Sequence, residues 1–427
     1  MTRHKVLAQL KRAQANARTA ALMFDTEPVL ADVRAAGEVV PGLERCVILT
    51  SGRPLPFGAY GPGQRRALVY GALFEGLAPD EETAERLLQS GRIKIGACHD
   101  HGCVGSVAGI YTASMPVFVV KNANGANVAF CNLYEGESRR RLNYGVYDDD
   151  VRAGLVFLEQ VVAPVLRQAL QHSGGIPLKP IIRRALSMGD ELHSRNTAAS
   201  ALFTRELFPY LLEAGKAEPD LVRRTVAFLQ ECDYFFLRLS MAAAKLTADA
   251  AHGIEASSVV TALALGSTHF AIRVSGLTEW IPGPLPGARV KLFDGYAEDD
   301  IEWLGGESCI TETVGLGGFA QAAAFPLQRY QGGTAAAMIR ANTEMYRITV
   351  AENPDYKIPF LNYRGTPTGI DIFSVTQTGI LPVIDAGVAG RQGGQIGAGT
   401  LIAPMECFTA AIAAYQRRYG LLTRAPA

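Results

Sequence analysis

The fold is decided by residues 148–171, DDDVRAGLVFLEQVVAPVLRQALQ, where the pattern of the chain changes. From here to about Gly253, few β-branched runs occur, and breaks rich in Gly and Pro separate long segments that are typical of helices. The expected helices are 150–171, 179–187, 191–214, 220–231 and 233–251. The sequence therefore predicts a helical middle layer, which we place at residues 148–253.

The chain before this layer, residues 1–147, mixes helix and strand signals. Its first part looks βαβ-like, with a helix near 27–36 and a strand at 47–50. Asp80 is a suitable N-cap for a helix over 80–90, because its carboxylate can accept hydrogen bonds from free backbone N–H groups. Further elements are expected as a helix at 61–76 and strands at 94–98, 115–121 and 127–133. This first unit is therefore predicted to be α/β.

The chain after the helical layer, residues 254–427, returns to sequence rich in strand formers. Strands are expected at 259–264, 271–274, 289–293 and 380–384, with helices at 334–350 and 407–419. The fold class is thus α/β: an N-terminal α/β unit, a helical middle layer and a C-terminal α/β unit. A length of 427 residues agrees with two or three hydrophobic cores.

Charge and cysteine usage narrow the function. The chain has 41 basic and 41 acidic residues, so no net field favours nucleic acid or an anionic membrane. No signal peptide and no run of about 18 uncharged apolar residues is evident, which predicts a cytoplasmic protein without a membrane span. The seven cysteines form no CxxC pair, so we expect reduced thiols and no structural zinc ribbon. Small molecules and protein partners remain the expected ligands.

The first dense polar cluster is residues 98–103, CHDHGC. If this segment is extended, His99 and His101 point the same way. Neutral imidazoles at this spacing could bind zinc, and either ring could instead move a proton or hydrogen-bond a substrate near neutral pH. The alternative is structural, in which these side chains satisfy loop carbonyls. A thiolate nucleophile at Cys98 or Cys103 is a further alternative.

The second cluster is residues 188–196, MGDELHSRN, which follows Ser187 and has the pattern of a helix start. On a helix, Asp190, His193 and Asn196 share one face, while Glu191 and Arg195 pair at i and i+4. The N–H groups at such a helix start, together with Arg195, would suit a carboxylate or phosphoryl group. Capping and a surface ion pair explain the same residues without function.

Three further features could bind an anion. On the expected helix 233–251, Arg238, Lys245 and Asp249 share a stripe that reads either as a solvated edge or as the cationic wall of a pocket, and Lys245 could contact an oxyanion. The glycine-dense stretches 315–318, including Gly317 and Gly318, and 387–399 could present backbone N–H groups, although close packing explains them equally. Glu312, just before the first of them, could act as a base. No P-loop, GxGxxG unit, GxSxG elbow or HExxH helix is present, and no cofactor is predicted.

These motifs together resemble a known family. Residues 98–102 (CHDHG), 188–191 (MGDE) with His193, Arg195 and Asn196, and Phe235-Phe236-Leu237 leading to 240–243 (SMAA) are similar to the YlbE/YahG-like family. That family was formerly a domain of unknown function and is associated with FdrA-type proteins and with the oxamate carbamoyltransferase of allantoin degradation, in purine catabolism. The resemblance runs from about residue 25 to 415. It implies a subunit of a multi-subunit transferase with FdrA-like partners, in a homo- or hetero-oligomer.

The resemblance also implies a reaction: oxalurate or a similar N-carbamoyl acid reacts with phosphate to give carbamoyl phosphate and oxamate, or the reverse. Onto it we place the predicted site. The catalytic candidates are His99, His101, Asp190 and His193, and the substrate-binding candidates are Arg195, Asn196, Lys245, Glu312, Gly317 and Gly318. Two other hypotheses stay open at this point. One is a metal-dependent amidohydrolase that uses the three histidines and Asp190, and the other is a non-catalytic scaffold for an FdrA-like partner.

Overall fold

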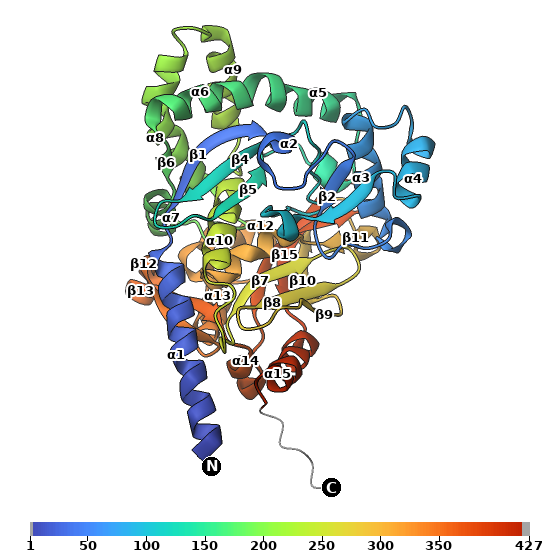
Figure 1. Cartoon of the computed structure of the whole chain (residues 1–427). Coiled ribbons are helices and arrows are strands. Elements are labelled where there is room, and N and C mark those ends of the chain that lie inside the picture. The colour runs from blue at the N-terminus through green and yellow to red at the C-terminus, as the bar shows by residue number, and fades with distance from the viewer. Residues whose placement is uncertain (1–2, 421–427) are drawn as a thin grey trace.

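The computed structural model describes residues 3–420 and shows an α/β protein with a helical middle region, as predicted. In Figure 1 the N-terminal sheet and the middle helices form the upper part, and the C-terminal sheets form the lower part. The first sheet is antiparallel in the order β5-β4-β1-β6. Its strands are β1 (Pro28–Ala35), β4 (Pro116–Asn122), β5 (Val128–Asn132) and β6 (Ile176–Pro177).

Strand β1 corrects the prediction of a helix near 27–36. Its residues pair with β4 on one side and with β6 on the other, and Leu30 and Val33 point into the core. This short segment has no helical propensity strong enough to outweigh two strand partners, so tertiary pairing decides its conformation. The predicted strands at 115–121 and 127–133 are confirmed as β4 and β5.

The remaining N-terminal elements pack beside this sheet. Asp80 caps its helix as predicted, since its carboxylate accepts a hydrogen bond from the backbone N–H of Thr83 at 2.8 Å. Strands β2 and β3 form a parallel pair. The elements are α1 (Arg3–Asp25), α2 (Ala36–Val39), β2 (Val47–Thr50), α3 (Pro62–Phe74), α4 (Glu81–Gln89) and β3 (Lys94–Ala97).

The middle region is helical. One nearly continuous helix, Asp149–Ser173, is long and apolar enough to cross a membrane by length and composition, but half of its most apolar stretch is buried in the fold. Its second half packs on β1 and α8 (Figure 1). The helices are α5 (Asp149–Phe157), a π-helical turn (Leu158–Val162), α6 (Ala163–Ser173), α7 (Lys179–Ser187), α8 (Thr197–Ala214), α9 (Pro219–Glu231) and α10 (Leu237–Ala250).

The predicted helix start at Glu191 is wrong, because α8 begins at Thr197. Ser187 ends α7 instead of capping the next helix, and residues between the two helices form turns. Leu192 adopts a left-handed φ of 71°, which no helix tolerates in its interior. The helix-face arrangement of Asp190, His193 and Asn196 therefore does not exist.

The C-terminal region contains two larger sheets and a hairpin. One sheet has the order β7-β8-β9 and the other β10-β15-β14-β11, both antiparallel. The strands are β7 (Val260–Leu265), β8 (Phe270–Val274), β9 (Ile281–Gly283), β10 (Gly287–Leu292), β11 (Ile301–Leu304), β12 (Thr349–Ile358), β13 (Arg364–Ile370), β14 (Val383–Gly390) and β15 (Gln395–Ile402). The helices are α11 (Ile310–Thr313), α12 (Gln328–Gln331), α13 (Ala335–Met345), α14 (Ile372–Thr378) and α15 (Met405–Tyr419).

Two predictions in this region need correction. The helix expected over 334–350 ends at Met345, and the chain then enters β12. The glycine-dense stretch 387–399 is largely strand, since it forms the ends of β14 and β15 and the tight turn between them. Gly393 and Gly394 have φ values of 78° and 81°, so they supply the left-handed turn.

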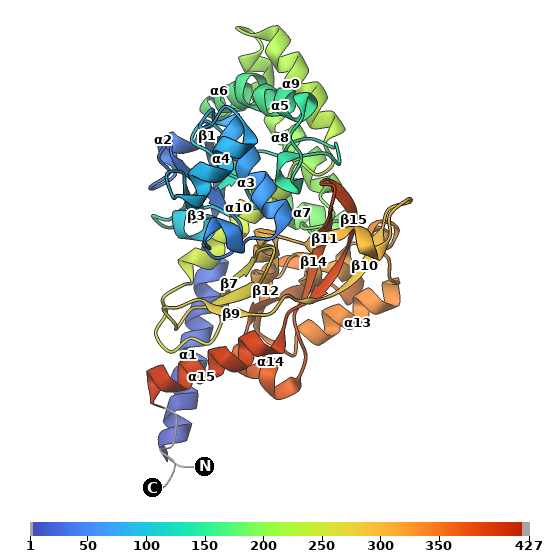
Figure 2. The ribbon, with the colours of Figure 1, turned by 90° about the vertical axis from the view of Figure 1, so that its right-hand side faces the viewer.

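The regions are tied together by contacts distant in sequence. Helix α1, which projects downward in Figures 1 and 2, packs on α10 and on the β12–β13 hairpin. The buried Asn16 side chain donates to Ser258 Oγ at 2.9 Å. The buried carboxyl group of Glu307 accepts from the backbone N–H groups of Gly52 at 2.8 Å and Gly105 at 2.9 Å, which joins the C-terminal region to two N-terminal loops.

Candidate functional site

An enclosed cavity of about 30 Å³ lies where the N-terminal, middle and C-terminal segments meet. One part of its wall is formed by residues 106–107, Gly305 and Ser308, and another part by His193 and Ser194. Its most prominent side chains are Arg141, Arg238, Tyr134, Tyr144, Tyr234 and Tyr330. We call this the arginine cavity. Junctions of this kind are a usual location for small-molecule sites.

Arg141 lies in the loop after β5 and is only 7% exposed. Its Nη2 donates to Gln395 Oε1 at 2.8 Å, and its guanidinium lies 4.9 Å from the ring centroid of Tyr144 and 5.2 Å from that of Tyr134. Cation–π contacts of this kind help a buried guanidinium to remain charged. Its Nε has no hydrogen-bond partner.

Arg238 lies near the start of α10 and is 2% exposed, so of the two interpretations of its stripe the solvated edge is wrong, and the wall of a pocket applies to Arg238. Its Nη1 donates to Asn132 Oδ1 at 2.8 Å, while its Nε has no partner. Among residues 3–420, neither Arg141 nor Arg238 has a carboxylate oxygen within 4.0 Å. The arginine cavity therefore contains two buried positive charges without an ion-pair partner.

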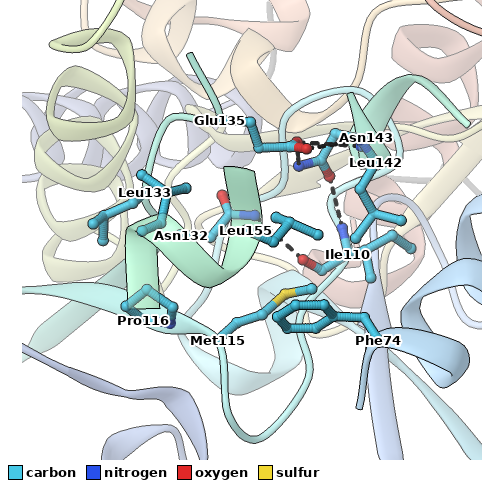
Figure 3. Close-up of a pocket in the computed structure, with 11 residues that line it drawn as sticks. Phe74, Ile110, Met115, Pro116, Asn132, Leu133, Glu135, Leu142, Asn143 and Leu155 are labelled. Carbon is cyan, nitrogen blue, oxygen red and sulfur yellow. Dashed lines mark hydrogen bonds between the residues drawn. The ribbon is translucent and has the colours of Figure 1, made fainter. Parts of the chain in front are cut away.

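A hydrogen-bonded network behind the cavity supports both arginines, and Figure 3 shows its members. Asn132, which accepts from Arg238, donates its Nδ2 to the carbonyl of Ile110 at 3.2 Å. Glu135 accepts from the backbone N–H of Leu142 at 2.7 Å and from the side chain of Asn143, and Asn143 in turn accepts from the N–H of Ile110. This network fixes the turn that follows Arg141, around a second, mostly apolar cavity of about 20 Å³.

His193 is the predicted site residue that lines the arginine cavity. Its Nδ1 lies 2.9 Å from Glu312 Oε1. Burial alone would lower the pKa of His193, but the attraction and hydrogen bond of Glu312 outweigh it, so the pKa is raised above its ordinary value. Because Nδ1 is engaged by Glu312, Nε2 is the ring nitrogen left for another partner.

The other members of the second cluster hold this histidine in place. Glu191 accepts from the backbone N–H of His193 at 2.7 Å, and Asn196 donates its Nδ2 to the carbonyl of His193 at 2.8 Å. Asp190 accepts from the N–H of Ala199 at 2.8 Å in the first turn of α8, and burial raises its pKa to about 6. Arg195 approaches Asp190 at 3.4 Å and does not line the cavity.

The structure does not bring the first cluster to this site. Residues Cys98–His101 form a 3-10 turn instead of an extended segment, so the two histidines diverge. His101 Nδ1 lies 2.7 Å from the carbonyl oxygen of Pro41. His99 is buried 5.2 Å from the ring of Trp280, where burial and the nearby Lys245 hold its pKa well below the ordinary value. Its two ring nitrogens have no hydrogen-bond partner.

Lys245 is also buried away from the arginine cavity, at 1% exposure, and is not on a solvated edge. Its Nζ pairs with Asp249 Oδ2 at 2.6 Å and donates to the carbonyl of His99 at 3.3 Å. Arg273 binds the other oxygen of Asp249. We call Lys245, Asp249 and Arg273 the paired cluster, because its positive charges have an internal counter-ion.

The predicted anion-binding glycines bind the protein itself. Gly318 donates its N–H to Glu312 Oε1 at 3.0 Å, and Gly317 donates to the carbonyl of Glu191 at 2.8 Å. Glu312 is fully buried and is not a strand-end carboxylate in solvent. These residues therefore belong to the support of His193.

Sequence reasoning missed Arg141 and the tyrosines of the cavity, and it interpreted Arg238 only as part of a stripe. The available signal was Arg238, a charge on a helix that is otherwise apolar almost all round.

The residues proposed for a metal site do not lie together. In the described part of the chain, no three His, Cys, Asp or Glu side chains form a group able to hold a metal ion. His99, His101, His193 and Asp190 lie in separate surroundings.

The fold and the cavity thus define an α/β protein with an enclosed cationic cavity at the junction of its regions. The chain belongs to the family of the oxamate carbamoyltransferase subunit AllG, whose model matches residues 93–308. This confirms the resemblance drawn from the sequence. The matched range includes Arg141, His193 and Arg238.

Two relatives from Escherichia coli K12 match over 96% of this chain. One is the uncharacterized protein YahG, 39% identical over 414 residues and 87% of its own length. The other is the oxamate carbamoyltransferase subunit AllG, 36% identical over 415 residues and 99% of its length. A crystal structure of a conserved protein of unknown function from Enterococcus faecalis V583 superposes with a TM-score of 0.92, at 36% identity, covering 96% of this chain and 99% of that one.

Proposed function

We propose that the chain is a subunit of a cytoplasmic carbamoyltransferase that interconverts oxalurate and phosphate with oxamate and carbamoyl phosphate. The proposal is supported by membership of the AllG family and by the relative named as an oxamate carbamoyltransferase subunit. FdrA-type partner subunits complete the enzyme. The observation that carries the proposal is the arginine cavity, where two buried guanidinium groups lie with no carboxylate oxygen of the described residues within 4.0 Å.

An uncompensated buried charge is costly, and a bound anion removes that cost. Guanidinium groups match carboxylate and phosphate oxygens through paired N–H donors. The lining of two guanidinium groups, a histidine and four phenols suits the oxygen atoms of a small acid. We therefore assign the carboxylate of oxamate or oxalurate to Arg141 and Arg238.

His193 takes the acid–base role in this proposal. In the phosphorolytic direction, a phosphate oxygen forms a bond to the carbamoyl carbon, and the bond from that carbon to the amide nitrogen breaks. The nitrogen must gain a proton to leave as oxamate, and the phosphate hydroxyl loses one. His193 Nε2 donates the first proton and, once neutral, accepts the second.

The test is phosphate release from carbamoyl phosphate and oxamate by the chain assembled with its FdrA-type partners. Arg238→Met should lower kcat/KM at least 100-fold, because the substrate carboxylate loses a buried guanidinium. Arg195→Met is the matched control, since Arg195 does not line the cavity, and it should change kcat/KM only a few-fold. Unchanged activity in Arg238→Met would reject this site.

The scaffold hypothesis is the second candidate, because the relative is named only as a subunit. It predicts that assemblies containing Arg238→Met and His193→Gln keep full activity. The two proposals therefore give opposite results in one assay.

A further inference from the structure

Three buried carboxyl groups surround His193: Glu312 on α11, Glu191 in the turn before α8, and Asp385 on β14. Each is at most 1% exposed. Three negative charges in such a small buried volume would repel one another strongly, so the cluster must hold protons. Which carboxyl is ionised decides the charge of His193.

Of the three groups, Glu312 is the one that contacts the imidazole ring of His193. Glu312 accepts from four donors: His193 Nδ1, the N–H groups of Gly318 and Asp385, and the hydroxyl of Thr311. Two of these bonds come from backbone groups that cannot reverse their direction. These four donors hold the Glu312 carboxyl group in one orientation, with Oε1 directed at His193 Nδ1.

Glu191 accepts from the backbone N–H groups of His193, Ser194 and Arg195, and its side-chain partner is the carboxyl group of Asp385. Asp385 Oδ1 accepts from the side chains of Gln321 and Gln331, while its Oδ2 has no donor other than the Glu191 carboxyl. Burial and repulsion raise the pKa of Glu191 well above its ordinary value and that of Asp385 to about 6. Two carboxyls can hydrogen-bond each other only when they share a proton.

We propose that Glu312 is the positioning residue of the site: it holds His193 as an imidazolium with Nε2 toward the cavity, while Glu191 and Asp385 share one proton. The inference rests on the proposed function, because it describes how the proton donor of that reaction is held. Carboxylates that fix the tautomer and orientation of a catalytic or metal-binding histidine act in this way.

The groups that face His193 come from several elements. Glu191 lies in its own turn, and the others are Glu312 (α11), Asp385 (β14), Arg238 (α10), Arg141 (the loop after β5), and the phenols of Tyr234 and Tyr330. The arginines oppose a positive charge on the ring, and Glu312 is the group that makes direct contact with it. Removal of the Glu312 charge should therefore leave His193 neutral.

The experiment is a pH titration of the full chain labelled with ¹⁵N-histidine. The chain has seven histidines, and the signal lost in His193→Gln identifies His193. In the wild type, its titration midpoint should lie above the ordinary value of about 6.5. In Glu312→Gln, which keeps an oxygen acceptor but loses the charge, proton affinity should fall at least tenfold.

Asp385→Asn is the matched control, because it makes the same carboxyl-to-amide change beside the same histidine. The amide can donate to Glu191 in place of the shared proton, so the His193 midpoint should move less than about threefold in proton affinity. If Glu312→Gln does not fold, Glu312→Asp retracts the charge by one methylene and should give an intermediate midpoint. An unchanged midpoint in the Glu312 variants, or an equal fall in Asp385→Asn, overturns the inference.

Oxamate binding, measured by calorimetry on the same samples, separates this inference from the proposed function. If the wild type binds oxamate but the titrations do not behave as described, only the positioning role of Glu312 is rejected. If the titrations behave as described but oxamate does not bind, the proposed function is rejected.

Discussion

The arginine cavity and the paired cluster are both buried and cationic, yet they handle their charge differently. In the paired cluster, Asp249 bridges Lys245 and Arg273, so each of the two positive charges contacts a carboxylate oxygen within the protein. In the arginine cavity, the hydrogen bonds and cation–π contacts of Arg141 and Arg238 go to neutral groups, namely Gln395, Asn132 and tyrosine rings, and Glu135 acts on Arg141 only from beyond ion-pair distance. A buried charge that has an ion-pair partner within the protein can serve the structure alone. A buried charge without such a partner destabilises the folded state, and a bound anion would offset that loss.

The largest expected effect breaks the balance of the paired cluster. Asp249→Asn removes the shared counter-ion and leaves two cations in partly or fully buried positions, so the free energy of unfolding should fall by about 3 kcal/mol. Urea denaturation measures this loss. The oxamate affinity of the folded protein should change only a few-fold. A loss of affinity as large as that expected for Arg141→Met would contradict a purely structural role of the paired cluster.

The second prediction, for Arg141, is a loss of ligand affinity without a loss of stability. Arg141→Met should weaken oxamate binding about 100-fold, or about 2.7 kcal/mol, because the carboxylate loses a desolvated partner. Its free energy of unfolding should stay level or rise, since an unpaired buried charge is replaced by an apolar side chain of similar length. Calorimetry and urea denaturation on one sample test both halves. Destabilisation without a change in affinity would make Arg141 structural.

The third prediction concerns a buried acid, Glu307, and the change of the free energy of unfolding with pH. Burial raises the pKa of this carboxyl to about 8. The folded state therefore holds a proton that the unfolded state releases above about pH 4.5, and stability should fall as the pH rises from there to about 8. Glu307→Gln should flatten this decline, which is about 2 kcal/mol between pH 5 and pH 6.5, in denaturation curves over that range. An unaltered slope would show that other groups cause it.

The smallest effect tests the size of the cavity. A Cβ atom at Gly387 would lie 2.5 Å from the hydroxyl of Tyr144, so Gly387→Ala should crowd the ligand and reduce oxamate affinity about tenfold, or about 1.4 kcal/mol. Gly58→Ala is the control, because a Cβ there meets no atom within 4 Å. Equal affinities of the two variants would place the ligand elsewhere.

Much of the fold follows from local signals. The Asp80 cap, helix α9 and strands β4 and β5 lie close to their predicted bounds, because propensity and tertiary contacts agree there. Strand β1 and the start of α8 were mispredicted for a common reason. Pairing with β4 and the left-handed turn at Leu192 are long-range or conformational effects that a sequence window does not contain.

The candidate site was predictable only in part. His193 could be found, because a dense polar cluster between apolar segments is unusual. Arg141 could not, because in the run Arg139–Arg141 it resembles a solvated loop residue, and only the packing of Tyr134 and Tyr144 against it shows its burial. The structure places His99 in the core beside Trp280, and polarity in sequence does not show whether a side chain faces a cavity or the core.

The central claim is that Arg141 and Arg238 bind the carboxylate of a small acid. A crystal structure of the chain with oxamate tests it most directly. We predict density for the acid in the arginine cavity, with its carboxylate oxygens within hydrogen-bond distance of both guanidiniums. Oxamate bound at Arg195 or Lys245, or an arginine cavity that holds only water at saturating oxamate, would contradict the account.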